Sequence, residues 1–285
     1  MEAVKAYINS CFSIKDLGPL KYFLGIEVTR SPASIFINQR KYDMELLDGT
    51  GLLGCKPSKV PMDSKHTLGL STSELMHDPT EYRRLVGRLI YLNVTRPDLA
   101  YPVHILSQFM CNPRQDHYQA ALKVLRYVKG APGQGLFFSA TAPLSLEAHC
   151  DADWASCPVT RSLAESEYRS MAHVTCELIW ISSLLKDLHV NHTTSIPLFC
   201  DIKATLHIAK NPVFHERIKH IEFDCHLVRQ YVNSKFIIPQ FLPGADQPTD
   251  ILTKAVTAEV LYQLIGKLGV TNFLHTSSLT RGISG

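Results

Sequence analysis

The sequence predicts an α+β N-terminal part followed by an α/β domain with a mixed sheet. Its 285 residues are 45% hydrophobic and 19% charged, which is typical of a globular chain of about two domains. In the first half, short β-patterned runs precede a series of amphipathic helices, whereas strands and helices alternate in the second half. A glycine- and proline-containing break at 130–133 separates the halves, and we place the domain boundary at residue 132.

Each element predicted in the first half follows from the spacing of its apolar residues. Runs rich in β-branched and aromatic residues predict strands, and apolar residues three or four apart predict helices. The weakly periodic segment 55–80, with three prolines, predicts a long connection. The predicted strands are 22–28 and 35–37, joined by a turn at Ser31-Pro32; the predicted helices are 41–53, one that begins at Tyr82 and is ended by Pro97, 101–109 and 118–128.

In the second half, segments with the apolar spacing of strands alternate with segments that have the apolar spacing of helices. The longest helix carries one apolar stripe through Met171, Val174 and Leu178. Strands are predicted at 136–139, 144–150, 198–200 and 236–241, and helices at 165–188, 204–209 and 220–232.

Composition also excludes several classes of protein. No uncharged apolar run reaches the roughly 18 residues that a membrane span needs, and the first residues lack the pattern of a signal peptide. The eight cysteines form no Cys-x-x-Cys pair, and most lie in apolar runs, which favours reduced, buried thiols. We therefore expect a cytoplasmic or nuclear protein.

Positive charge is concentrated in the first half. Residues 1–142 carry 17 Lys and Arg against 12 Asp and Glu, and 79–130 alone carry 8 against 3. A basic block beside an acidic half fits a nucleic-acid surface next to a metal site, although a solvated helix face explains the charge equally well. The candidate nucleic-acid-binding residues are Arg83, Arg84, Arg88, Lys123, Arg126 and Lys129.

Three acidic residues stand where a metal site could form. Asp151 and Asp201 each end a predicted strand, and Glu167 lies on the apolar stripe of the long helix, where burial of a carboxylate is costly unless a cation compensates it. Such a cluster binds Mg²⁺ or Mn²⁺, and a pair of ions can act on a phosphodiester. Helix caps or surface charges remain the plain alternative, and periodicity cannot separate Asp151 from Asp153.

Several long sequence words resemble the C-terminal part of the Pol polyprotein of copia-type LTR retrotransposons, which comprises the end of the reverse transcriptase and ribonuclease H. The resemblance covers roughly residues 10–256. The words are Lys15-Asp-Leu-Gly-Pro-Leu-Lys-Tyr-Phe-Leu-Gly-Ile-Glu-Val28, Tyr82-Arg-Arg-Leu-Val-Gly-Arg-Leu-Ile-Tyr91, Thr95-Arg-Pro-Asp98, Leu125-Arg-Tyr-Val-Lys-Gly130, Cys150-Asp-Ala-Asp-Trp-Ala155, Ala164-Glu-Ser-Glu-Tyr-Arg169, Asn211-Pro-Val-Phe-His215, Lys219-His-Ile-Glu222 and Asp250-Ile-Leu-Thr-Lys254.

The resemblance implies a ribonuclease H site and two departures from the family pattern. It implies that Asp151, Glu167, Asp201 and Asp250 are the catalytic, metal-binding set, with Asp151 favoured over Asp153. The polymerase's own Tyr-x-Asp-Asp word is absent from this chain and would lie upstream. The family has about thirty residues, two strands of the sheet, where this chain has only 156–163, which is too short for two strands of about 5–6 residues each.

The resemblance therefore implies a retrotransposon Pol fragment with an impaired ribonuclease-H-like domain. Its partners would be an RNA–DNA hybrid or a template–primer duplex, its cofactor two Mg²⁺ or Mn²⁺ ions, and no membrane is expected. The alternatives are a non-catalytic nucleic-acid-binding remnant and a pseudogene product. The implied parts are a reverse transcriptase palm remnant and connection (1–80), a helical thumb or connection segment (81–132), a ribonuclease-H-like domain (133–256) and a C-terminal tail (257–285).

Overall fold

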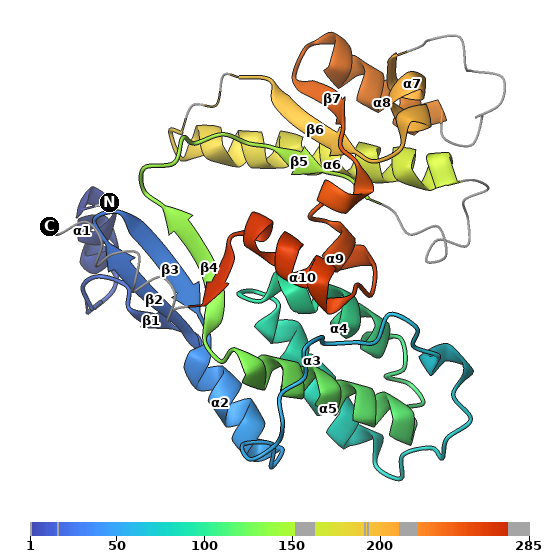
Figure 1. The fold of residues 1–285 in the computed structure, drawn as a ribbon. Coiled ribbons are helices and arrows are strands. Elements are labelled where there is room, and N and C mark those ends of the chain that lie inside the picture. The colour runs from blue at the N-terminus through green and yellow to red at the C-terminus, as the bar shows by residue number, and fades with distance from the viewer. Residues whose placement is uncertain are drawn as a thin grey trace, which may run out of the picture.

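In its described residues, the chain folds as mixed α and β structure with a five-stranded and a three-stranded sheet. The computed structural model describes residues 2–15, 17–151, 163–190, 192, 194–210 and 222–272. Figure 1 shows one sheet with most of the helices in the lower half of the view and the second sheet above it. The C-terminal helices lie between these two layers (Figure 1).

The first sheet is antiparallel throughout, in the order β1-β2-β3-β4-β8. Gly135 allows the close pairing of β3 with β4, because a Cβ at this position would lie 2.1 Å from the Ile37 carbonyl oxygen. The strands are β1 (Tyr22–Phe23), β2 (Ile26–Ser31), β3 (Ser34–Asn38), β4 (Gln134–Ser139) and β8 (Val270–Asn272).

Helices cover the first core. Leu85, Leu89 and Leu92 share one buried face, as their spacing predicts. Ile251 and Leu264, from the end of the chain, join the same core. The helices of this half are α1 (Glu2–Cys11), α2 (Arg40–Gly49), α3 (Pro79–Leu92), α4 (Ala100–Ser107), α5 (Gln115–Gly130), α9 (Asp250–Thr253) and α10 (Ala258–Ile265), with short 3₁₀ turns η1 (Leu68–Leu70), η2 (Pro97–Leu99), η6 (Gly244–Asp246) and η7 (Gly266–Leu268).

A buried ion pair fastens η2 to α5. Arg96 is fully buried and donates two hydrogen bonds to Asp98, at 3.0 and 2.8 Å. The Tyr127 hydroxyl donates to the same carboxylate at 2.8 Å, and the guanidinium lies 5.5 Å from the Tyr127 ring centroid. Two of the family motifs, Thr95-Arg-Pro-Asp98 and Leu125–Gly130, therefore contact each other in the fold.

A further buried carboxyl, that of Asp43, lies beside this ion pair. Burial raises its pKa to about 6, against the opposing effects of Arg96 and of the Gly133 amide, which donates to it at 2.9 Å. Because the folded protein holds a proton that the unfolded chain has lost between pH 4 and 6, stability falls as pH rises through this range.

We expect this group to reduce the free energy of unfolding by up to about 3 kcal/mol between pH 4 and pH 7. Asn cannot ionise, so Asp43→Asn should show a correspondingly flatter pH dependence over that interval. Urea unfolding of both proteins at half-unit pH steps measures this difference. Equal slopes for the two proteins would contradict the prediction.

The second sheet is parallel in its described residues, in the order β5-β6-β7. Apolar residues of β6 and of the long helix, such as Leu198 and Met171, form its core. Helices α6 and α8 pack against each other and on these strands. The elements are β5 (Ala148–His149), α6 (Leu163–Asp187), β6 (Ile196–Cys200), α7 (Lys203–Lys210), α8 (Glu222–Asn233) and β7 (Ile237–Phe241).

Several expectations differ from this structure. The sheet expected to be mixed in the second half is parallel in its described strands, and the strand expected over 22–28 is split into β1 and β2 by Leu24 and Gly25, which both have positive φ. The helix expected over 41–53 ends at Gly49, before Gly51 turns the chain with a φ of +69°. The strand expected over 144–150 shrinks to Ala148–His149, because only these residues pair with β6. Strand β4 joins the first sheet rather than the second, and the expected tail contains α10 and β8. The domain boundary at residue 132 stays a prediction.

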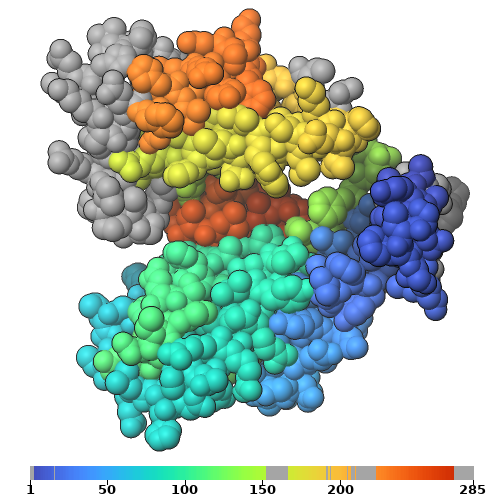
Figure 2. Space-filling view, turned by 180° about the vertical axis from the view of Figure 1, so that it is seen from behind, coloured from blue at the N-terminus to red at the C-terminus, as the bar shows by residue number. Residues whose placement is uncertain are grey.

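The C-terminal segment connects the two halves. Helix α9 packs against α4 and η2, and β8 pairs with β4. Figure 2 shows this segment in red, lying between α6 in yellow and the helices of the first half in green. Among the described residues, no helix combines the length and the apolar character needed to cross a membrane.

Candidate metal centre

The carboxyl ends of two parallel strands bring the first two acidic residues together. Asp151 follows the β5 strand by two positions, and Asp201 comes directly after β6. Parallel neighbours end at the same edge of a sheet, which is where α/β folds place their sites. The Cys150 amide donates to the Phe199 carbonyl at 2.9 Å and continues the pairing up to the site.

Glu167 completes a group of three carboxylates. Its side chain is fully buried in the first turns of α6, on the stripe that also carries Met171 and Leu178. One carboxylate oxygen from each of Asp151, Glu167 and Asp201 lies within 4.8 Å of the others. The buried Oδ1 atom of Asp201 has no hydrogen-bond partner, so this carboxylate retains an oxygen for a ligand.

Asp250, at the start of α9, lies against this group. Its pKa is raised, first by burial and also by a hydrogen bond to Asp151, while Lys254 acts in the opposite direction. The Lys254 ammonium lies 3.0 Å from Asp250 Oδ1 and 3.4 Å from Asp151 Oδ1. The structure thus brings Asp151, Glu167 and Asp201 together, and the Lys254 ammonium links Asp250 to Asp151.

Three residues that sequence reasoning did not single out hold the site in place. The buried Gln247 side chain donates to the Cys150 carbonyl at 3.0 Å and meets His149 Nδ1 at 2.7 Å, which fixes the turn before Asp250. The Thr253 hydroxyl donates to Asp151 Oδ2. Lys254 is the third, and its spacing of four from Asp250 on a helix is the signal that could have indicated the ion pair.

The donor set fits a hard divalent cation. Mg²⁺ and Mn²⁺ prefer carboxylate oxygens, and the four acids supply only such donors. The pKa of Asp250 is raised first by burial and also by the neighbouring Asp151 carboxyl, as expected of crowded acids. The Lys254 ammonium offsets part of this charge.

Two thiols lie directly beneath the acids. Cys150 and Cys200 are both fully buried, and their Sγ atoms are 2.7 Å apart. Cys150 Sγ also donates to Glu167 Oε1 at 3.6 Å. The hydrogen bond to Cys200 and burial both raise the pKa of the Cys150 thiol, which therefore stays protonated at neutral pH.

The basic block has a more structural role than its charge indicates. Arg83 donates to the carbonyls of Met110 and Cys111, Lys129 to those of Leu53 and Cys55, and Arg88 lies over the Tyr42 ring. These contacts attach two connecting segments and helix α2 to α3 and α5. Arg96, which also contributes to the basic count, is buried in its ion pair and offers no charge to a partner.

Two of the candidate basic residues, Lys123 and Arg126, line a hollow on α5. This cavity of about 390 Å³ is lined by Lys65, His66, Lys123 and Arg126, together with Asp63, which pairs with Lys123. Arg84 is exposed on α3. The accessible part of the basic surface is therefore smaller than the sequence predicts.

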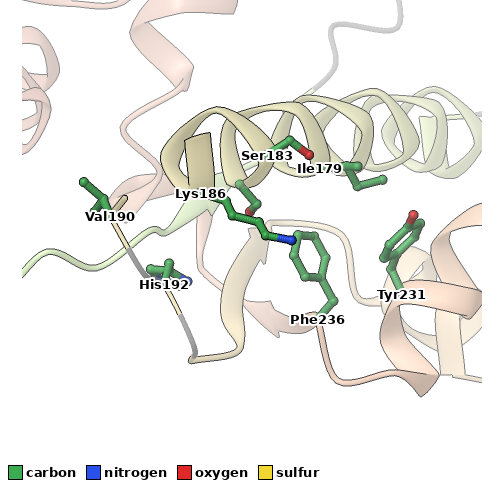
Figure 3. A pocket seen from close by; sticks show the side chains of 8 residues that line it. Ile179, Ser183, Lys186, Val190, His192, Tyr231 and Phe236 are labelled. Atoms are coloured by element: carbon green, nitrogen blue, oxygen red, sulfur yellow. The ribbon is translucent and has the colours of Figure 1, made fainter. Parts of the chain in front are cut away.

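A second cavity lies at the far end of the parallel sheet. Its volume is about 360 Å³, and Figure 3 shows Lys186 of α6 reaching toward Phe236, with His192 and Tyr231 nearby. His192 accepts a hydrogen bond from the Leu146 amide at 3.1 Å and has a structural role. This cavity lies at the amino ends of the strands, away from the four acids. Asp153, Lys219, His215 and His220 lie outside the described residues.

The chain is similar to transposon proteins of plants. It is 38% identical to the retrovirus-related Pol polyprotein from transposon RE1 of Arabidopsis thaliana over 291 residues, covering 93% of this chain and 20% of that protein. It is 28% identical to the corresponding polyprotein from transposon TNT 1-94 of Nicotiana tabacum, covering 92% of this chain and 23% of that protein. It is 37% identical to the uncharacterized mitochondrial protein AtMg00810 of Arabidopsis thaliana, covering 62% of this chain and 84% of that protein.

No family model and no solved structure matches the chain. The chain spans about a fifth of the length of the two Pol polyproteins. With 38% identity running over more than nine-tenths of its residues, it belongs to the family of retrovirus-related Pol polyproteins of copia-type transposons, as a fragment of such a protein.

Proposed function

We propose that the second half of this chain is a ribonuclease-H-like domain with a two-metal site for hydrolysing the RNA strand of an RNA–DNA hybrid, and that its turnover is impaired. The observation that carries the proposal is that carboxylate oxygens of Asp151, Glu167 and Asp201 lie within 4.8 Å of one another. Asp250 is hydrogen-bonded to Asp151 beside them. The family resemblance assigns the same four positions. The parallel β5-β6-β7 sheet supports this reading.

Each part of the site has a defined task in this proposal. Asp151 and Asp201 would hold the metal from the strand ends, and Glu167 from the buried face of α6. Bound Mg²⁺ supplies charge stabilisation of the attacking and leaving oxygens. The Lys254 ammonium compensates part of the charge of Asp151 and Asp250, and a bound metal ion would supply that compensation in its place.

Impairment is proposed because β5 is an edge strand of only two residues with no neighbour beyond it in the described chain. The comparison with transposon RE1 supports a deletion in this chain. That alignment is 291 positions long but includes only 93% of this 285-residue chain, or about 265 residues. The difference, about 26 positions, corresponds to residues of the RE1 protein that have no counterpart in this chain. A loss of this size matches the absent pair of strands.

Metal binding is the direct test of the site. We expect the chain to bind Mn²⁺ and Mg²⁺ at millimolar concentrations, and Asp151→Asn to abolish binding because this residue contacts both the acidic group and Asp250. Isothermal titration calorimetry measures the affinity, and the exposed Asp63→Asn serves as a control of equal charge change. Absence of binding, or equal binding by the Asp151 variant, would refute the site.

Nucleic-acid binding without turnover is the second candidate function. The basic residues around the α5 hollow favour it. Affinity for duplex should fall steeply with salt, because phosphate contacts release counterions. Replacement of Arg84, Lys123 and Arg126 by Gln should weaken binding to all sequences and lower the slope of log affinity against log salt by up to about 3, roughly one per lost phosphate contact.

The matched control replaces Arg30, Arg40 and Lys41 by Gln, which removes the same charge from β2 and α2. Fluorescence anisotropy at several salt concentrations measures both variants. An affinity that does not change with salt, or equal losses in the two triple variants, would show that the basic block is a solvated face.

A further inference from the structure

The two buried thiols form a cluster that the proposed nuclease does not use. Cys150 and Cys200 occupy the next paired position after His149 and Phe199 in the parallel strands, so their side chains emerge on the same face. Both are 0% exposed, and Glu167 Oε1 is 3.6 Å from the Cys150 sulfur. One ligand atom from each of these three residues lies within 4.8 Å of the others.

We propose that Cys150, Cys200 and Glu167 form a binding site for a thiophilic divalent cation such as Zn²⁺ or Cd²⁺. Thiolate sulfur is the donor that distinguishes this site from the oxygen-only group of Asp151, Glu167 and Asp201. Three protein ligands leave one tetrahedral position for water. On binding, each thiol loses its proton to solvent as its sulfur forms a bond to the metal, and no oxidation occurs.

The distances favour this geometry after a small adjustment. A tetrahedral ion with metal–sulfur bonds of about 2.3 Å holds two sulfurs about 3.8 Å apart. The two sulfurs lie 2.7 Å apart, so each has to move by about 0.5 Å for both to bind one ion. The Cys150 sulfur and the Glu167 oxygen already have the separation that two ligands of one ion require.

A disulfide is the other bond that this pair could form. It would bring the two sulfurs from 2.7 Å to about 2.05 Å apart and would need an oxidant, whereas binding of a cation needs none. The test therefore keeps the chain reduced.

Glu167 would be shared with the acidic site, so a thiophilic ion would withdraw one ligand from the Mg²⁺ position. This consequence rests on the proposed function, but the thiol site itself does not. Its readout is the ultraviolet charge-transfer absorption between thiolate sulfur and Cd²⁺, which no carboxylate produces.

The test titrates Cd²⁺ into the full chain kept reduced by a phosphine. We expect one equivalent to produce the thiolate absorption, Cys150→Ser and Cys200→Ser to lose it, and Glu167→Gln to weaken binding by roughly tenfold or more. Cys176→Ser, exposed on α6, is the matched control and should bind like the wild type. Asp151→Asn should lose Mg²⁺ binding and keep the absorption, which separates failure of this inference from failure of the nuclease proposal.

Circular dichroism of each serine variant shows whether it folds, and Cys150→Ala and Cys200→Ala provide substitutions without a buried hydroxyl. The wild type gives a decisive result by itself. No absorption at one equivalent of Cd²⁺, with all thiols shown to be reduced, would overturn the inference. Absorption that persists in the folded Cys150 and Cys200 variants would overturn it as well, because the exposed cysteines would then be the ligands.

Discussion

Replacing Arg96 with methionine should lower the free energy of unfolding by about 3–5 kcal/mol. The substitution keeps much of the side-chain volume but leaves the Asp98 carboxylate in the core, where the Tyr127 hydroxyl is its remaining side-chain donor among the described residues. An uncompensated buried charge is among the most damaging changes that a single substitution can make. Urea unfolding followed by far-ultraviolet circular dichroism measures the loss.

Two further variants make this result specific to the buried pair. Arg83→Met removes an exposed guanidinium from α3 and should cost far less. The double variant Arg96→Met/Asp98→Leu removes both charges and should recover much of the loss, since apolar residues can replace a buried pair. A decrease of less than about 1 kcal/mol in the free energy of unfolding of Arg96→Met is what loss of an exposed ion pair would cause. Such a result would contradict the buried ion pair of this structure.

Restoring a two-stranded hairpin between Ala155 and Leu163 should raise ribonuclease H turnover by at least about 100-fold. The restored strands would cover the free edge of β5 and hold Asp151 against Glu167 and Asp201. Metal-assisted cleavage requires ligands fixed to within about 0.5 Å, and the packed strands behind them provide that rigidity. Cleavage of a labelled RNA–DNA hybrid in Mg²⁺ compares the two proteins.

The control for this experiment carries the hairpin together with Asp201→Asn, which should return turnover to background. A flexible glycine–serine insertion of equal length tests whether added chain length alone is sufficient. Equal turnover by the original chain and the restored protein would show that two strands are dispensable. The proposal of impaired activity would then be wrong.

Sequence periodicity located the parts of the site that lie on long regular elements. Glu167 could be found because α6 repeats its apolar residues over many turns, and Asp201 because it ends a strand. The strand pattern left Asp151 and Asp153 as alternatives, and only the family resemblance favoured Asp151. Asp250 could be identified only through the family resemblance, because α9 has four residues and is too short to show a periodic pattern. Their roles as metal ligands remain predictions.

Long-range pairing explains most of what periodicity could not show. Arg96 and Asp98 are two residues apart in a 3₁₀ turn, where no repeat indicates burial, and their neighbour Tyr127 comes from another helix. The pairing of β4 with β3 joins segments almost a hundred residues apart in the chain. Three-residue β8 is too short to be recognised without its partner β4.

The return of the C-terminal segment to the first half bears on the order in which the protein can assemble during synthesis. Asp250 begins α9, whose supports are α4 and η2, and the segment ends in β8 on the first sheet. Contacts between such distant segments form late, because the intervening chain must first be made and ordered. A nascent chain that has emerged only as far as β7 can build the parallel sheet, yet its acidic centre lacks the fourth carboxylate and the Lys254 ammonium. The fourth carboxylate therefore joins the other three only after α9 has been made and has packed on α4 and η2.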